Sequence, residues 1–86
     1  MIKKMCRLDI MVEAVCHHPD DSSRVYTFGI EYDNYNPLVD SEECEQFKKQ
    51  LREVIQHEVN PTGYWHDVEI YLVWYFDNKK YREEVA

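Results

Sequence analysis

The densest group of chemically capable side chains in the sequence is the run from Cys16 to Asp21, which reads CHHPDD. A thiolate and an imidazole together suit zinc, and a closed zinc site needs four ligands. The missing ligands would have to come from distant positions in the sequence, namely Cys6, Cys44, His57 and His66. No paired-ligand spacing such as C-x-x-C supports this arrangement. The sequence therefore predicts a polar loop here, with no metal site and no cofactor.

Two cysteines could also serve as nucleophiles, which need a base within reach and a group that orients it. Cys16 stands beside His17 and His18, but neighbours on a strand point to opposite faces. Cys44 lies near the start of a predicted helix, where the helix dipole lowers a thiol pKa, yet it also lies on the apolar stripe of that helix. No nucleophile elbow, phosphate-binding glycine loop or H-E-x-x-H motif is present in the sequence. We expect no catalytic residues, and a small enzyme that uses Cys16, His17 or His18 is the least favoured alternative.

Length and charge restrict the partners of the protein. The chain has 86 residues, which make one domain, residues 1–86. It carries 17 acidic and 10 basic residues, so it lacks the clustered cations that bind nucleic-acid phosphates or an anionic membrane surface. No apolar run is long enough to span a membrane, the first residues lack a signal-peptide h-region, and the irregularly spaced cysteines fit reduced thiols. We expect a cytoplasmic protein that binds neither nucleic acid nor membrane directly.

Three segments alternate apolar and polar residues with the period of two that is typical of half-buried strands: residues 6–16, 24–32 and 64–76. The loop at 17–23 joins the first two segments as an antiparallel hairpin. A turn at 77–80 would let residues 81–85 return as a short fourth strand. The alternation predicts an antiparallel sheet of three or four strands.

A helix is predicted between the second and third of these strands. Asp40 with Glu43 matches a capping box, and Val39 with Cys44 matches a hydrophobic staple around that cap. The run Asn60-Pro61-Thr62-Gly63 ends the helix, because proline removes a hydrogen-bond donor and disfavours helix in the residue before it. The apolar positions between these signals form one stripe: Cys44, Phe47, Leu51, Val54, Ile55 and Val59.

These elements predict an α+β fold of two layers, in which one helix packs on one face of an antiparallel sheet of three or four strands. The chain order is ββαβ, or ββαββ if the last segment pairs. A helix between the second and third strands favours pairing of the third strand with the first. The expected spatial order is therefore 2-1-3, or 2-1-3-4. One helix covers one face of the sheet and leaves the other uncovered.

The third strand indicates what the uncovered face carries. Its row with Ile70, Leu72 and Trp74 is apolar and should face the helix. The opposite row and two acidic positions of the first two strands make the predicted partner-binding surface: Trp65, Asp67, Glu69, Tyr71, Val73, Tyr75, Glu13 and Glu31. Further apolar residues are expected near it, namely Met11, Val15 and Val25.

Aromatic side chains on strands could also stack RNA bases, but the charges on this face argue against such a platform. Arg7 is the only cation on the strand positions assigned to it, against several carboxylates. Asp67 and Glu69 could act as an acid–base pair among aromatic residues, where desolvation raises a pKa. The simpler interpretation is that both carboxylates keep an exposed sheet polar.

An acidic surface with aromatic anchors suits a basic groove on another protein, since carboxylates steer the encounter and Trp and Tyr supply binding energy. The predicted function is a non-enzymatic protein-binding module, in one version a stoichiometric inhibitor of a nucleic-acid-binding enzyme. Small acidic proteins of phages that inhibit restriction or CRISPR enzymes are similar to this chain in size and charge. The alternative is an obligate homodimer whose aromatic sheet faces pack together, as a structural or assembly subunit.

Overall fold

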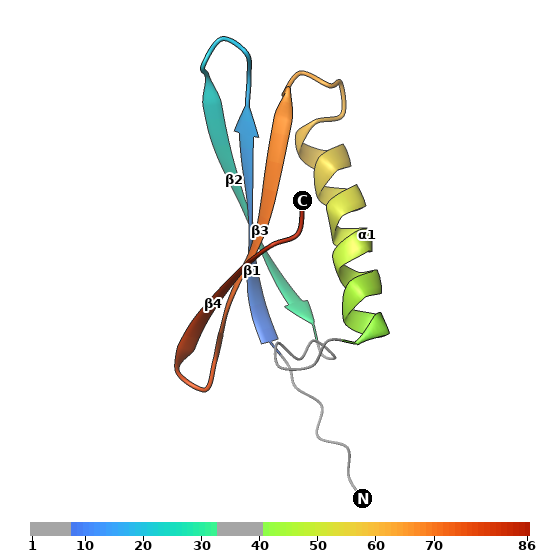
Figure 1. Ribbon diagram of the computed structural model, residues 1–86, viewed down its shortest axis with the longest axis vertical. Coiled ribbons are helices and arrows are strands. Elements are labelled where there is room, and N and C mark those ends of the chain that lie inside the picture. The colour runs from blue at the N-terminus through green and yellow to red at the C-terminus, as the bar shows by residue number, and fades with distance from the viewer. Residues whose placement is uncertain (1–7, 33–40) are drawn as a thin grey trace, which may run out of the picture.

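The computed structural model describes residues 8–32 and 41–86, and its elements follow the order β-β-α-β-β (Figure 1). They are β1 (Leu8–His17), β2 (Ser23–Tyr32), α1 (Glu42–Val59), β3 (Asp67–Phe76) and β4 (Lys79–Glu84). The last segment therefore does form a strand, and the longer of the two expected chain orders is confirmed.

The four strands form one antiparallel sheet in the order β2-β1-β3-β4. β1 pairs with β2 along its whole length, and it pairs with β3 from Ile10↔Trp74 to His17↔Asp67. Figure 1 shows α1 beside one face of this twisted sheet, and α1 is the only helix within residues 8–32 and 41–86. The predicted α+β fold and the predicted strand order are both confirmed.

The core lies between α1 and the face of the sheet that α1 covers, which we call the inner face. Burial alternates along β1, since successive side chains of a strand point to opposite faces. It alternates along β3 as well, except at Val73, which is only 8% exposed on the face away from α1. The inner positions of these two strands are nearly inaccessible to solvent: Leu8, Ile10, Val12, Ala14, Cys16, Val68, Ile70, Leu72 and Trp74. The helix adds Cys44, Leu51, Ile55 and Val59. The core row predicted for the third strand is therefore confirmed.

The buried stripe of α1 differs from the predicted one at Val54, which is 62% exposed. Leu51, Ile55 and Val59 recur every four residues, whereas Val54 lies about 100° around the helix from Ile55. Phe47 is half-buried, and its ring stacks on that of Tyr32 at the end of β2 with 3.9 Å between ring centroids.

Within residues 8–32 and 41–86, no helix is long and apolar enough to cross a membrane.

The N-terminus of α1 is capped by Ser41, one residue later than the sequence predicted. The Ser41 backbone is extended, with φ −119° and ψ 157°, and its hydroxyl accepts a hydrogen bond from the Cys44 amide at 3.2 Å. The predicted capping box of Asp40 and Glu43 is therefore wrong, because Glu43 is only the second helical residue. Asp40 and Val39 themselves lie outside the described residues.

Ser41→Ala is expected to lower the free energy of unfolding by about 1 kcal/mol, because the first turn loses the acceptor for the Cys44 amide. Ser41→Asn should retain most of the stability, since asparagine is an equally good cap. Urea unfolding of both variants and of Asp40→Ala gives the comparison. A larger loss for Asp40→Ala than for Ser41→Ala would place the start of the helix back at Asp40.

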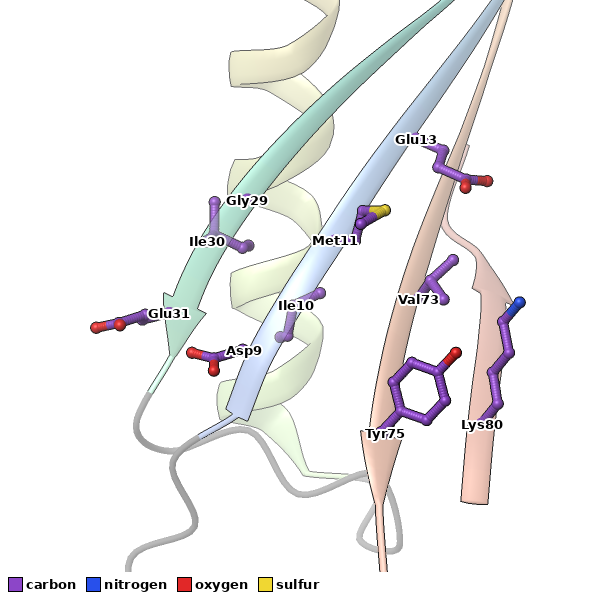
Figure 2. Close-up of a pocket in the computed structure, with 10 residues that line it drawn as sticks. All are labelled: Asp9, Ile10, Met11, Glu13, Gly29, Ile30, Glu31, Val73, Tyr75 and Lys80. Atoms are coloured by element: carbon purple, nitrogen blue, oxygen red, sulfur yellow. The ribbon is translucent and has the colours of Figure 1, made fainter. Parts of the chain in front are cut away.

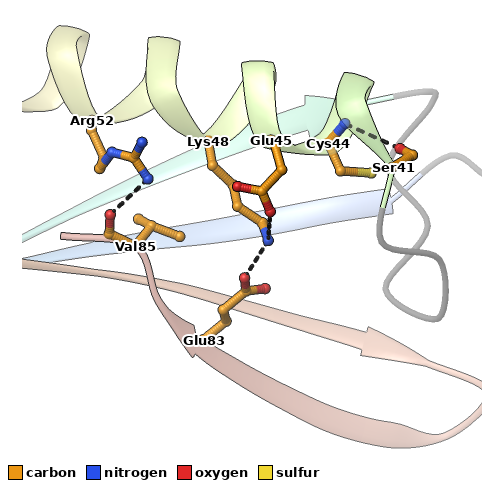
Figure 3. Close-up of polar contacts among 7 residues, drawn as sticks. All are labelled: Ser41, Cys44, Glu45, Lys48, Arg52, Glu83 and Val85. Carbon is orange, nitrogen blue, oxygen red and sulfur yellow. Dashed lines mark hydrogen bonds and ion pairs between the residues drawn. The ribbon is translucent and has the colours of Figure 1, made fainter.

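Two long basic side chains tie α1 to the C-terminal part of the sheet (Figure 3). Lys48 Nζ lies 2.5 Å from Glu83 Oε1 on β4 and 3.2 Å from Glu45 Oε1 on its own helix. Burial of the ammonium lowers the pKa of Lys48, but hydrogen bonds to Glu83 and Glu45 outweigh this effect, so the pKa is raised. Arg52 donates a hydrogen bond to the Val85 carbonyl at 3.0 Å. These contacts fix β4 and the residues that follow it to the helix.

Candidate functional site

The face of the sheet that α1 leaves uncovered, which we call the outer face, is hollowed near the end where β1 begins and β3 ends (Figure 2). Strand pairing places Met11 opposite Gly29 on one side and opposite Val73 on the other. Since Gly29 carries no side chain, this row is open over β2. The hollow has a volume of about 550 Å³, and Gly29, Met11 and Val73 form its apolar floor.

Charged and aromatic side chains surround this floor. Figure 2 shows the carboxylates of Asp9 and Glu31 on the β2 side, with Tyr75 and Lys80 on the β4 side. Glu13 lies farther along β1 and also lines the hollow. Tyr75 is 65% exposed, so most of its ring is available for contact. In the part of the chain that the structure describes, the arrangement is an apolar surface with three carboxylates, one phenol and one ammonium at its edge.

A chain of polar contacts crosses the outer face next to the hollow. His17 Nε2 lies 2.7 Å from Glu69 Oε2, and the Tyr71 hydroxyl donates to Glu69 Oε1 at 2.9 Å. The Arg82 guanidinium lies 3.8 Å above the centre of the Tyr71 ring and 3.8 Å from Glu13 Oε2. Tyr71 thus lies between two charged groups, and Glu13 lies within ion-pair distance of Arg82.

The same contacts shift two pKa values on this face. Hydrogen bonds from His17 and then from Tyr71 lower the pKa of Glu69, because both stabilise the carboxylate. The hydrogen bond to Glu69 raises the pKa of Tyr71, because ionisation of the phenol would place two negative charges side by side. Glu69 is therefore a carboxylate at neutral pH, which makes it unsuited to the role of a general acid.

β4 adds two cations to this face, Lys80 and Arg82, that were not predicted from the sequence. Lys80 and Arg82 point outward because they pair with Tyr75 and Val73. The expectation that Arg7 is the only cation there is wrong, and Arg7 itself lies outside the described residues. On the outer face of the described strands, acidic side chains still outnumber basic ones: Asp9, Glu13, Glu31, Asp67, Glu69 and Glu84.

Trp65 does not continue the outer row, contrary to the prediction. β3 begins at Asp67, and Trp65 lies in the preceding connection, half-buried against the core. The Asn60 side chain holds it there, accepting from the Trp65 amide at 2.9 Å and donating to its carbonyl at 3.0 Å. Of the other predicted surface residues, Glu13, Glu31, Val73 and Tyr75 line the hollow. Asp67, Glu69 and Tyr71 lie farther along the same face.

The residues of the CHHPDD segment separate in space. Cys16 is buried in the core, and this burial raises the pKa of its thiol despite the opposing charge of Arg24. His17 points to the outer face, whereas the His18 ring stacks on Tyr64 at 4.7 Å. Within the described ranges, no group of three or more His, Cys, Asp or Glu side chains is placed to hold a metal ion. The buried thiol and the separated rings do not support nucleophilic catalysis at this segment.

The Asp20 carboxylate organises the turn after β1. It accepts hydrogen bonds from the side chain and the backbone amide of Ser22, the latter at 2.9 Å, and it lies 2.9 Å from His18 Nδ1. These contacts lower the pKa of Asp20 to about 2, with Ser22 making the largest contribution. The polar loop that the sequence predicted at this position is therefore a hydrogen-bonded turn.

The predicted binding surface, with the apolar residues expected near it, did not include five residues that line the hollow: Asp9, Ile10, Gly29, Ile30 and Lys80. Gly29 did leave a signal, because an isolated glycine within an alternating strand pattern marks a bulge or a close approach of another group. No local pattern in the sequence marks Lys80, since the face to which its side chain points depends on the pairing of β4 with β3.

The hollow and its carboxylate edge are the features of this protein that could bind a partner or a ligand. One helix on an antiparallel sheet is an architecture that hosts many activities, so the fold alone does not select among them. No protein-family model, no curated protein and no solved structure matches the chain.

Proposed function

We propose that this protein is a non-catalytic binding module that holds a basic surface of another protein against its outer face. The observation that carries the proposal is the hollow of about 550 Å³, which combines an apolar floor with the carboxylates of Asp9, Glu13 and Glu31. The core is built on the opposite face of the sheet, so none of these residues is needed to bury α1. Their clustering on the uncovered side favours a role in recognition.

The exposed apolar residues provide the anchors for such an interface. Tyr75 is 65%, Met11 47% and Val25 57% exposed, and all three belong to strands of the outer face. Tyrosine is enriched among the residues that dominate binding energy, and methionine is enriched at interfaces. An apolar centre with a charged edge is the usual composition of a protein–protein interface.

The carboxylates select the charge of the partner. With a net charge of −7 on the whole chain, the protein attracts basic surfaces and repels acidic ones. One form of this function is stoichiometric inhibition of a nucleic-acid-binding enzyme, in which carboxylates take the place of phosphates in its basic groove. A dimer with outer faces packed together would oppose two acidic edges, and like charges across an interface cost binding energy.

The test compares two variants that remove the same charge from different faces. Asp9→Asn/Glu31→Gln neutralises the edge of the hollow, whereas Glu53→Gln/Glu58→Gln neutralises two exposed positions of α1. Partners captured from the source cell with the wild-type protein are purified, and their binding to each variant is measured by calorimetry at low and high salt. We expect the first variant to bind roughly tenfold more weakly with a smaller salt dependence, and the second to bind like the wild type.

Light scattering during size-exclusion chromatography supplies the accompanying measurement, and we expect a monomer. Equal binding by the two double variants would contradict the proposal, because the outer face would then make no special contribution. A stable dimer that both Asp9→Asn/Glu31→Gln and lower pH strengthen would instead support packing of two outer faces.

A further inference from the structure

Gly29 lies in the middle of β2, at a position where the fold does not require glycine. Its φ is not positive, since Gly63 is the only glycine with positive φ in the described part of the chain. A Cβ atom built on Gly29 would meet no other atom within 4 Å. Glycine in the interior of a strand weakens it, and such a position often marks a close approach by a ligand or another backbone. Neither backbone geometry nor packing requires glycine here. What glycine does provide is open space above the strand, which a ligand could occupy.

The pairing of β1 with β2 places that space in the hollow. Gly29 lies opposite Met11 on the outer face, while its neighbours Phe28 and Ile30 pack toward the core. A side chain at position 29 would therefore occupy the floor of the hollow. Clefts that bind drug-sized ligands have volumes of roughly 300–1,000 Å³, so this hollow of about 550 Å³ has room for one side chain of a partner.

The lining restricts what can fill the hollow. An apolar floor suits an aliphatic stem, and the carboxylates of Asp9 and Glu31 at its edge suit a cation. The exposed ring of Tyr75 suits a planar cation in particular, because guanidinium groups stack on aromatic faces and pair with carboxylates in a fork geometry. Lysine carries a compact, strongly hydrated charge that uses neither property well.

The chain itself contains this arrangement beside the hollow. The Arg82 guanidinium lies 3.8 Å above the Tyr71 ring and 3.8 Å from Glu13 Oε2, so it uses an aromatic face and a carboxylate together. On the other row of β2, away from the hollow, the Arg24 guanidinium lies 4.8 Å from the centre of the Tyr26 ring. The hollow also offers an aromatic ring, Tyr75, and a carboxylate, Asp9, which lie on opposite sides of β1 (Figure 2).

We infer that the hollow around Gly29 is a pocket for one arginine side chain of a protein partner. The stem would lie over Gly29 and Met11, with the guanidinium between the Tyr75 ring and the carboxylates of Asp9 and Glu31. This inference rests on the proposed function, whose basic partner supplies the arginine. Among the described residues that line the hollow, Lys80 is the one cation, and it opposes a second positive charge there.

The test uses a blocked arginine, N-acetyl-arginine methylamide, titrated into the ¹⁵N-labelled protein and followed by amide NMR shifts. We expect saturable shifts at Gly29 and Met11 with a dissociation constant on the order of millimolar, as suits a single side chain. The matching citrulline derivative, which is neutral and nearly the same shape, should bind at least tenfold more weakly. The blocked lysine should also bind more weakly than the arginine, and Lys80→Gln should tighten binding of the arginine several-fold.

Gly29→Val is the decisive variant, because it fills the hollow and leaves every charge in place. It should abolish the arginine-dependent shifts while the protein stays folded, since nothing obstructs its Cβ and valine favours strands. Thr27→Val is the matched control, two residues along the same face of β2, and it should bind the arginine like the wild type. Unchanged binding by Gly29→Val, or equal binding of citrulline, overturns the inference.

The same probe separates this inference from the proposed function. If arginine fails to bind and the partner still distinguishes Asp9→Asn/Glu31→Gln from Glu53→Gln/Glu58→Gln, the proposed function stands and the arginine pocket falls. If arginine binds but the partner ignores the outer face, the hollow takes free guanidinium compounds, and both proposals are overturned.

Discussion

Leu72→Ala is expected to lower the free energy of unfolding by about 2–5 kcal/mol, the range for a buried leucine truncated in a packed core. Leu72 is 0% exposed on the inner face of β3, and it pairs with Val12 of β1, which is also 0% exposed. Removing its side chain leaves a cavity at the centre of the sheet that rigid neighbouring strands cannot close. Urea unfolding followed by circular dichroism measures the loss.

Val25→Ala is the control for this measurement. Val25 is 57% exposed on the outer face of β2, so its truncation should cost less than about 1 kcal/mol. If Leu72→Ala is no more destabilising than Val25→Ala, the core does not lie on the inner face. The outer face would then not be a surface that is free for binding.

Tyr75→Ala is expected to weaken partner binding by about 2 kcal/mol or more, roughly thirtyfold, with the fold unchanged. The ring is 65% exposed and lines the hollow, so it contributes little to the core and much to any interface formed there. Tyr75→Phe keeps the ring and should retain most of the affinity. Calorimetry with the captured partner gives the affinities, and amide NMR spectra of each variant report on the fold.

Tyr64→Ala provides the matched comparison, because Tyr64 is 57% exposed but lies in the connection before β3, against the His18 ring. Its loss should leave partner binding unchanged. An equal loss of affinity in both variants would show that exposed tyrosines act without regard to face, and the outer face would no longer be the site.

Tyr71 is a poorer anchor than the sequence suggested, because Glu69 and Arg82 already engage it.

The sequence predicted most of the fold because apolar and polar residues alternate along β1 and β3, and burial follows this pattern except at Val73. A period of two assigns each residue to a face whatever the strand pairs with, and so the inner row with Ile70 and Leu72 was predictable. The start of the helix was harder, since Asp40 and Ser41 are both good N-cap residues and adjacent in the sequence. Trp65 was misplaced because the alternating pattern runs on into the connection that Asn60 holds to the helix end.

The hollow could not be predicted from periodicity, because it depends on register. Gly29 matters only because it lies opposite Met11, which in turn lies opposite Val73. Lys80 and Arg82 reach the outer face only because β4 pairs antiparallel with β3. These are contacts between segments far apart in the sequence, and no local pattern specifies which residues will meet.

The position of β1 inside the sheet also governs how the chain folds. β1 meets β2 through a short turn, which forms in microseconds, but a two-stranded hairpin is marginally stable by itself. Its other edge must wait until the connection and α1 have brought β3 alongside, and this closure of a long loop costs entropy before any core contact repays it. We therefore expect the docking of β3 onto β1 to come later in folding than the contacts between β1 and β2. Until that docking, the buried edge of β1 is an open strand edge on which a second chain could pair.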